Sequence, residues 1–291
     1  MNLLKALGMG LLQGLTEFLP VSSSGHLAIF KCIFHVDTGT GIFFDVLLHV
    51  GTLISVFVAF WDDIVMLFKE GIGILVDFGH NLGVFFHNCA TKEEKYAYEK
   101  VVTSSYRKFV MLVIVATIPT GIMGIAGKDF VEVAGESLLV PGIGLIVTAL
   151  VLFVADRCKG GKKLPSTVTY LEGFITGMVQ GIATLPGVSR SGSTIAACLL
   201  LGFEKKFAVK YSFIMSVPAI LGAAVLELKD VIESPPPAGE IPMYLAGMVV
   251  AAIVGFICIK TMMIVVRNNK FTIFSIYCLI AGIVCLVAHF K

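Results

Sequence analysis

Charged residues are scarce in this sequence: Asp, Glu, Lys and Arg make up 14% of its 291 residues, whereas a soluble domain usually carries about 25%. Apolar residues make up 57%, and the mean hydropathy is +0.92. A chain this apolar has too little polar surface to face water on all sides. The shortage of charge excludes an ordinary soluble protein and indicates a polytopic membrane protein surrounded by membrane lipids.

Cysteine and histidine clusters are also missing. None of the seven cysteines lies in a C-x-x-C pair, and the six histidines include no H-E-x-x-H spacing. We therefore interpret the cysteines as small buried hydrophobic residues and not as a disulfide or metal framework. The net charge of +2 gives no reason to expect a nucleic-acid partner.

Six apolar stretches are long enough for a transmembrane helix, which needs about 20 residues to cross a hydrocarbon core of roughly 30 Å. They are residues 42–61, 109–127, 138–156, 208–228, 241–264 and 271–289. Residues 64–86 are apolar too and could form a seventh span, but charges recur along them, so we expect an interfacial helix there. Residues 91–108 are polar enough to lie in water.

Two further apolar stretches, 3–30 and 170–202, are each interrupted by a short segment rich in Pro, Gly and Ser. Irregular backbone at membrane depth survives only where protein or trapped water satisfies its polar groups. We therefore expect each stretch to form a re-entrant helical hairpin, in which two short helices are joined by a break inside the membrane.

The two interrupted stretches resemble each other. A shift of 167 residues aligns seven identical pairs: Gly10 with Gly177, Gln13 with Gln180, Gly14 with Gly181, Val21 with Val188, Ser22 with Ser189, Ser24 with Ser191 and Gly25 with Gly192. We therefore expect two repeats, 1–157 and 158–291. Three predicted spans separate the hairpins, so the second repeat enters the membrane from the opposite side. The expected fold is an all-α integral membrane protein with six transmembrane helices and two re-entrant hairpins, arranged as an inverted-topology repeat.

Basic residues are distributed unevenly along the chain. Most of the 22 lysines and arginines fall in segments 62–108, 157–169, 203–210 and 260–270, which all lie on one predicted side. Because positive charge concentrates in cytoplasmic loops, these segments are expected in the cytoplasm and both termini outside it.

Arg190 is the most informative residue of the second break, because a charged side chain inside the membrane is costly and usually functional. Its planar guanidinium suits phosphate oxygens, and the helix that follows would present free N–H groups to an anion. An alternative role is a structural ion pair with Glu17, and the two roles can coexist.

The first break contains polar groups that complement Arg190 of the second break. Gln13 and Glu17 are four residues apart and share a helical face, and Glu17 could hold a divalent cation or act as a general acid or base. The serines at 22–24 offer a hydroxyl nucleophile, for which His26 could be the base. Alternatively, the serines only cap the next helix and His26 is only hydrogen-bonded. An anion clamp, a nucleophile and a base together make a set for phosphoryl transfer.

Two segments resemble the signature motifs of the undecaprenyl-diphosphate phosphatase family, also called the bacitracin-resistance family: residues 13–26, QGLTEFLPVSSSGH, and residues 186–194, PGVSRSGST. The resemblance extends over essentially the whole chain. It implies a bacterial inner-membrane enzyme that converts undecaprenyl pyrophosphate to undecaprenyl phosphate and inorganic phosphate, usually with Mg²⁺ or Ca²⁺. This reaction recycles the lipid carrier of cell-wall precursors.

The resemblance also implies residue roles. Ser23 would be the nucleophile or anchoring hydroxyl, and His26 the acid/base residue, supported by Glu17. Arg190 would clamp the pyrophosphate. The substrate-binding side chains would be Gln13, Ser22, Ser24, Ser189, Ser191 and Thr194. The first motif begins with Glu or Gln in the family, so with Gln at position 13 a metal ion would depend on Glu17 as a lone carboxylate. Direct attack by His26, or by water that Glu17 activates, stays open, as does a homodimer.

Three other classes of protein share some of these features. The phosphatidate-phosphatase superfamily also uses Ser-Gly-His and Ser-Arg elements, but it needs a His and an Asp where this chain has Ala196 and Leu200, which excludes it. A transporter that flips a polyprenyl phosphate shares the expected architecture, although binding alone needs no activated hydroxyl. A purely structural scaffold leaves the intramembrane charges unexplained.

Overall fold

The computed structural model describes residues 2–34, 41–91, 95–135, 137–233 and 238–290. Its helices are α1 Leu3–Phe18, α2 Ser23–Phe34, α3 Gly41–Ala59, α4 Trp61–Ala90, α5 Ser105–Ala126, α6 Lys128–Gly135, α7 Leu139–Asp156, α8 Tyr170–Ile182, α9 Arg190–Leu200, α10 Lys205–Glu233, α11 Ile241–Arg267 and α12 Phe271–His289, with a 3-10 turn at Ala238–Glu240. The only β pairing among these residues is one isolated bridge, so the prediction of an all-α fold is confirmed.

Five described helices are long and apolar enough to cross a membrane: α5, α7, the Lys205–Leu226 part of α10, α11 and α12. A sixth span requires α3 and α4 to be taken together, although the chain bends by 89° between them. The chain is therefore a multi-pass membrane protein with five or six candidate spans. The predicted stretch 42–61 corresponds to α3, which forms part of this bent pair.

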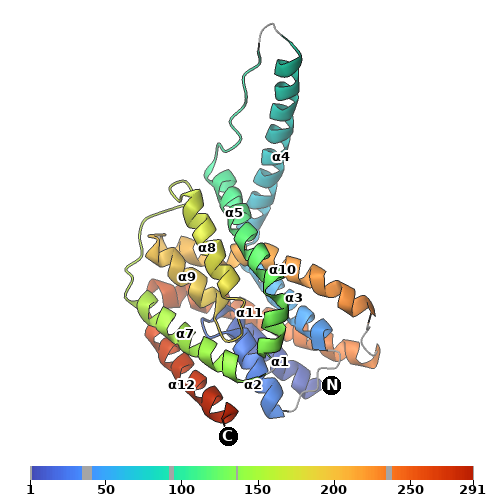
Figure 1. The fold of residues 1–291 in the computed structure, drawn as a ribbon, viewed down its shortest axis with the longest axis vertical. Coiled ribbons are helices and arrows are strands. Elements are labelled where there is room, and N and C mark those ends of the chain that lie inside the picture. The colour runs from blue at the N-terminus through green and yellow to red at the C-terminus, as the bar shows by residue number, and fades with distance from the viewer. Residues whose placement is uncertain (1, 35–40, 92–94, 136, 234–237, 291) are drawn as a thin grey trace.

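Helix α4 differs in length from the expected interfacial helix at 64–86. It is one continuous helix of 30 residues, and it projects away from the other helices (Figure 1). The guanidinium of Arg107 on α5 pairs with Glu70, at 2.9 Å, and with Asp77. Further along α4, Asn81 and Asn88 hydrogen-bond the backbone of the segment before α5. These contacts cover the polar side of α4 and explain why the helix extends beyond the predicted range.

At each predicted hairpin the structure has two short helices, α1 with α2 and α8 with α9. The two breaks share a helix cap: the hydroxyl of Ser22 accepts from the backbone N–H of Gly25 at 3.3 Å, and that of Ser189 from Gly192 at 3.1 Å. Their backbones differ, because the left-handed residue is Ser22 in the first break and Gly187 in the second, at φ 70° and 86°. The capping interpretation therefore holds for these two serines.

The repeated glycines allow two close helix crossings. A Cβ atom on Gly10 would lie 2.2 Å from the carbonyl oxygen of Gly247, so α1 packs backbone to backbone against α11. A Cβ atom on Gly177 would lie 2.1 Å from the carbonyl oxygen of Ala116, and α8 packs in the same way against α5. Small residues at such crossings are typical of helix packing in membranes.

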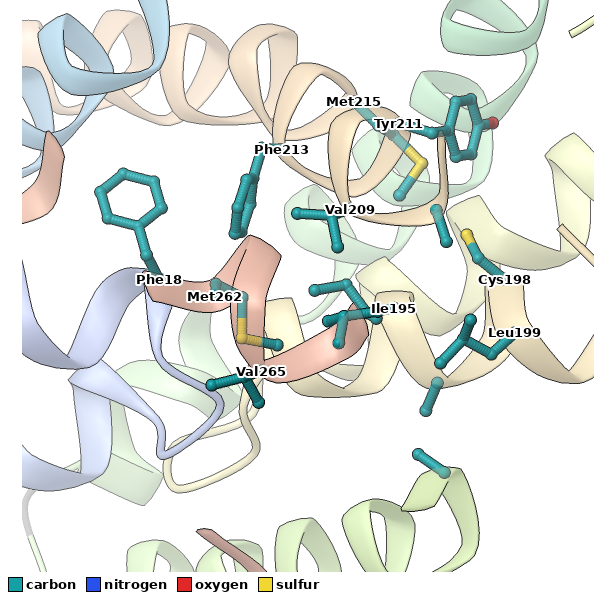
Figure 2. Packing of buried hydrophobic residues seen from close by; sticks show 14 of the residues in the cluster. Phe18, Ile195, Cys198, Leu199, Val209, Tyr211, Phe213, Met215, Met262 and Val265 are labelled. Carbon is teal, nitrogen blue, oxygen red and sulfur yellow. The ribbon is translucent and has the colours of Figure 1, made fainter. Parts of the chain in front are cut away.

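A buried hydrophobic cluster joins the ends of the two breaks (Figure 2). Phe18 at the end of α1 packs edge-on against Phe213 of α10, with ring centroids 5.3 Å apart. Ile195 of α9 and Met262 of α11 belong to the same cluster, and both are fully buried. The cluster therefore fixes the end of α1 relative to the start of α9.

Gly144 of α7 provides a test of how tightly the second break is packed. A Cβ atom there would lie 2.3 Å from the carbonyl oxygen of Pro186 and 2.8 Å from Cα of Gly187. Gly144→Ala should lower the free energy of unfolding by about 1–3 kcal/mol, because the backbone of the break must move. Thermal unfolding in detergent measures this. The control is Gly124→Ala, whose Cβ meets nothing within 4 Å, and equal melting temperatures for the two variants would show that the break tolerates displacement.

The four basic segments meet at one end of the molecule. Lys163 pairs with Phe203 in the isolated bridge. The ammonium group of Lys210 lies 2.8 Å from the carboxylate of Asp63, and that of Lys205 donates to the carbonyl of Arg267 at 3.4 Å. Segments predicted to share one side of the membrane are therefore neighbours in space.

Candidate active site

The two breaks border a cavity of about 230 Å³. Six of the predicted site residues line it: Glu17, Ser22, Ser23, Ser24, Ser189 and Arg190. Pockets for drug-sized ligands have volumes of about 300–1,000 Å³, so this cavity suits a small polar group and leaves a long apolar tail outside. The sequence-based expectation that the two breaks converge is confirmed.

Arg190 is the first residue of α9 and forms an ion pair with Glu17 of α1. One guanidinium nitrogen, Nη2, donates to Oε1 of Glu17. The other, Nη1, is buried, and no acceptor among the described residues reaches it. A buried donor left without a partner costs about 1–3 kcal/mol. The guanidinium is thus held by one carboxylate and retains a donor for an anion in the cavity.

Ser23 is the serine that contacts the acidic residue. Its hydroxyl donates to Oε2 of Glu17 at 2.7 Å, so a carboxylate is in place to accept the proton if this oxygen attacks an electrophile. The hydroxyls of Ser22 and Ser24 lie 3.2 Å apart, and that of Ser24 accepts from the backbone N–H of Gly187 at 3.4 Å. Ser24 thus links the two breaks, while Ser23 has the geometry of a nucleophile.

Three predicted substrate-binding residues do not line the cavity. Gln13 is fully buried, and its amide donates to Glu17. The hydroxyl of Ser191 donates to the carbonyl of Leu19 at 3.4 Å, which ties the second break to the first. The hydroxyl of Thr194 donates to the carbonyl of Arg190 at 2.8 Å. In this structure all three position the residues that do line the cavity.

His26 also lies away from the cavity lining. Its Nδ1 is 2.8 Å from the carbonyl oxygen of Ser22, and its Nε2 is 2.6 Å from the hydroxyl of Tyr277. The imidazole and the Tyr277 ring stack with centroids 5.5 Å apart. The role of His26 as acid/base residue stays a prediction, since the group that contacts Ser23 here is Glu17.

Several cavity residues were not among the predicted site residues. His49 of α3 lines the cavity, together with a polar wall formed by Thr120, Gln180, Thr184 and Ser216. The sequence did contain a signal for His49, because an ionisable side chain inside a predicted span is a functional candidate by default. The polar wall carries no comparable signal, since single hydroxyl groups are common in apolar helices.

The described residues do not fit a metal ion that binds without substrate. Among the described residues, Glu17 is the only Asp or Glu that lines the cavity, and both of its oxygens accept hydrogen bonds, from Arg190, Ser23 and Gln13. No cluster of three potential His, Cys, Asp or Glu ligands occurs in the part of the chain that the structure covers. Mg²⁺ is commonly held by one or two carboxylates together with substrate phosphates. A cation here would therefore depend on oxygens that the substrate brings.

Fold and site define an all-helical membrane protein in which two helix breaks meet at a cavity lined by serine hydroxyls and by the Glu17–Arg190 ion pair. Residues 6–284 match the family described as bacitracin resistance protein BacA, and the chain belongs to this family. It is 38% identical to the undecaprenyl-diphosphatase of Methanosphaera stadtmanae and 40% identical to that of Alkaliphilus metalliredigens, each over 287 residues that cover 99% of this chain and 98% of the relative. The undecaprenyl-diphosphatase of Carboxydothermus hydrogenoformans is 37% identical over 292 residues, which cover 99% and 97%.

Proposed function

We propose that this protein is a membrane-embedded undecaprenyl-diphosphatase, which hydrolyses undecaprenyl pyrophosphate to undecaprenyl phosphate and inorganic phosphate and so recycles the lipid carrier of cell-wall synthesis. The names of its relatives support this function. The observation that carries it is the buried, unpartnered Nη1 of Arg190, in a cavity that Ser23 also lines while its hydroxyl is bonded to Glu17.

The proposed reaction uses these three residues in order. Arg190 binds the pyrophosphate oxygens, and the N-terminus of α9 adds a positive dipole end. The Ser23 oxygen attacks the terminal phosphorus, the bridging P–O bond breaks, and undecaprenyl phosphate leaves with the electron pair. Glu17 takes the serine proton and passes it to the leaving phosphate oxygen, which regenerates the carboxylate. It then takes a proton from the water that attacks the phosphoserine and returns it to the Ser23 oxygen as the P–O bond breaks, releasing inorganic phosphate. In the alternative version Glu17 activates water for direct attack, and Ser23 only anchors the phosphate.

The finer membrane topology is part of the proposal: six spans, two re-entrant hairpins, and inverted repeats at 1–157 and 158–291. Helix packing supports it, because α1 of the first repeat packs on α11 of the second, while the corresponding α8 of the second packs on α5 of the first. Likewise α3 packs on α11, and its counterpart α10 packs on α5. Such exchanged pairs are expected when two copies face each other in opposite orientations.

We also propose that the cavity faces away from the cytoplasm and that both termini are extracytoplasmic. The basic segments that meet at one end mark the cytoplasmic side. The lining residues His49, Thr120 and Ala223 come from the halves of α3, α5 and α10 that lie farther from those segments. The headgroup would therefore enter from outside. A homodimer stays a prediction.

Phosphate release by the purified protein in detergent tests the function. Undecaprenyl pyrophosphate should release inorganic phosphate, and farnesyl pyrophosphate and inorganic pyrophosphate serve as comparisons for tail dependence. Binding of the lipid without phosphate release would contradict the proposal and favour the transporter alternative.

Removal of divalent cations tests the predicted Mg²⁺ or Ca²⁺. Excess EDTA should stop phosphate release, and added Mg²⁺ should restore it. Isothermal titration of substrate-free protein with Mg²⁺ should show no tight site, because Glu17 is a lone carboxylate and its two oxygens already accept hydrogen bonds from Arg190, Ser23 and Gln13. Undiminished activity in EDTA would remove the cation from the reaction.

A further inference from the structure

His49 lines the cavity but takes no part in the proposed reaction. Its side chain is 41% exposed, which makes it accessible to a ligand. Its Nδ1 lies 3.1 Å from Nε2 of Gln13 and 4.0 Å from Oε2 of Glu17. The charged groups that face it from the packed helices are Glu17 on α1 and, through Glu17, Arg190 on α9.

Gln13 determines which nitrogen of His49 carries the proton. The Gln13 nitrogen is 3.1 Å from the Glu17 carboxylate and 3.1 Å from Nδ1 of His49. Of the two ends of the Gln13 amide, only the NH₂ group can donate to the Glu17 carboxylate, so Glu17 fixes the orientation of the amide. The second amide hydrogen then points to Nδ1 of His49, which must be an acceptor. A neutral imidazole that accepts at Nδ1 carries its hydrogen on Nε2.

Nε2 of His49 is therefore a hydrogen-bond donor. No hydrogen bond between Nε2 and another described residue is present, and this nitrogen is not among the sealed, unpartnered atoms. It is a donor on an accessible side chain of the cavity wall. Arg190, whose Nη1 donor is buried and without a partner among the described residues, lines the same cavity.

We propose that His49 is a substrate-binding residue whose neutral Nε2–H donates to a pyrophosphate oxygen, and that Gln13 is the positioning residue that keeps it in this tautomer. The proposal rests on the proposed function. It also gives Gln13 a purpose: a glutamate at this position would accept from Nδ1–H instead, which would turn Nε2 into an acceptor and repel the anion.

Two substitutions at one position separate binding from structure. The side-chain amide of asparagine reaches about as far from the backbone as Nδ1 of histidine. His49→Asn therefore keeps an acceptor for the Gln13 amide but loses the Nε2–H donor in the cavity. A glutamine amide reaches about as far as Nε2, so His49→Gln keeps that donor. Size-exclusion chromatography first confirms that both variants are folded. We then measure the steady-state kinetics of the variants and the wild type with undecaprenyl pyrophosphate, and the inhibition constant of inorganic pyrophosphate for each.

His49→Asn should raise KM and the inhibition constant of inorganic pyrophosphate by about 10–100-fold, with little change in kcat, because a hydrogen bond to a charged acceptor acts in the ground and transition states alike. His49→Gln should stay within about threefold of the wild type, as expected for a retained donor. Normal pyrophosphate affinity in His49→Asn, or equal losses in both variants, would overturn the proposal. A wild-type protein that binds undecaprenyl pyrophosphate without releasing phosphate would instead contradict the proposed function, and the pyrophosphate affinities of the variants could still be compared.

Nitrogen NMR of protein labelled with ¹⁵N-histidine gives a readout that is independent of activity. His49, assigned by its absence from His49→Gln, should show an unprotonated Nδ1 in the wild type. In Gln13→Glu the same nitrogen should become protonated. A protonated Nδ1 in the wild type would contradict the tautomer.

Discussion

Arg190→Ala is expected to lower kcat/KM for undecaprenyl pyrophosphate by about 10³-fold or more, the range found when a cationic clamp is removed from a phosphoryl-transfer site. The reason is that the cavity loses Nη1, its buried unpartnered guanidinium donor, while the serine hydroxyls remain. Arg190→Lys keeps the charge but not the planar fork, so a smaller loss of about 10–100-fold is expected. Near-normal phosphate release from Arg190→Ala would reject the clamp.

The Arg190 variant needs a control for stability. Its removal leaves Glu17 buried without a counter-ion, and breaking a buried pair costs about 3–5 kcal/mol. The double variant Glu17→Gln with Arg190→Ala removes this penalty, since the amide is neutral. It should melt closer to the wild type than Arg190→Ala does and remain inactive. Activity regained in the double variant would mean that the single variant had failed through misfolding.

Ser23→Ala should cause the second large loss, about 10³-fold or more in kcat, because removal of a nucleophile leaves only residual catalysis. Ser24→Ala should lose less than about tenfold, since its hydroxyl makes only long hydrogen bonds, at 3.2 Å to the hydroxyl of Ser22 and at 3.4 Å to the backbone of the second break. Equal losses in the two variants would show that the wrong hydroxyl was chosen.

Trapping separates the two versions of the reaction. If Ser23 is the nucleophile, rapid acid quenching with substrate labelled at the terminal phosphate should yield a labelled protein, and Ser23→Ala should yield none. A wild-type protein that turns over without ever becoming labelled would favour attack by water that Glu17 activates.

The sequence was sufficient to predict the parts of the site that follow from local pattern. The repeated Gly and Ser positions identified both breaks, because they have the same structural role in each copy. Ser22 and Ser189 each cap the helix that follows the break. Gly10 and Gly177 each allow a close crossing with another helix. The ion pair between Arg190 and Glu17 was an alternative that the sequence offered beside the phosphate clamp, since each is a costly charge that needs a partner at membrane depth, and the structure contains it.

Other features depend on tertiary contacts that the sequence does not display. Spacing places His26 on the same helical face as Ser23, but its rotamer is decided by the Ser22 carbonyl and by Tyr277 of α12. His49 was missed because one polar residue hardly changes the hydropathy of the stretch 42–61. The extent of α4 was underestimated, because the contacts that cover its polar side come from residues after position 94 and from α5.

A structure of the protein with methylenebisphosphonate, a pyrophosphate mimic that cannot be hydrolysed at its bridge, tests the central claim most directly. We expect one phosphonate group within hydrogen-bonding distance of Arg190 Nη1 and close to the Ser23 hydroxyl, between the two breaks. Density for the mimic elsewhere on the protein, with Arg190 Nη1 still unpartnered, would contradict the assignment of this cavity as the active site.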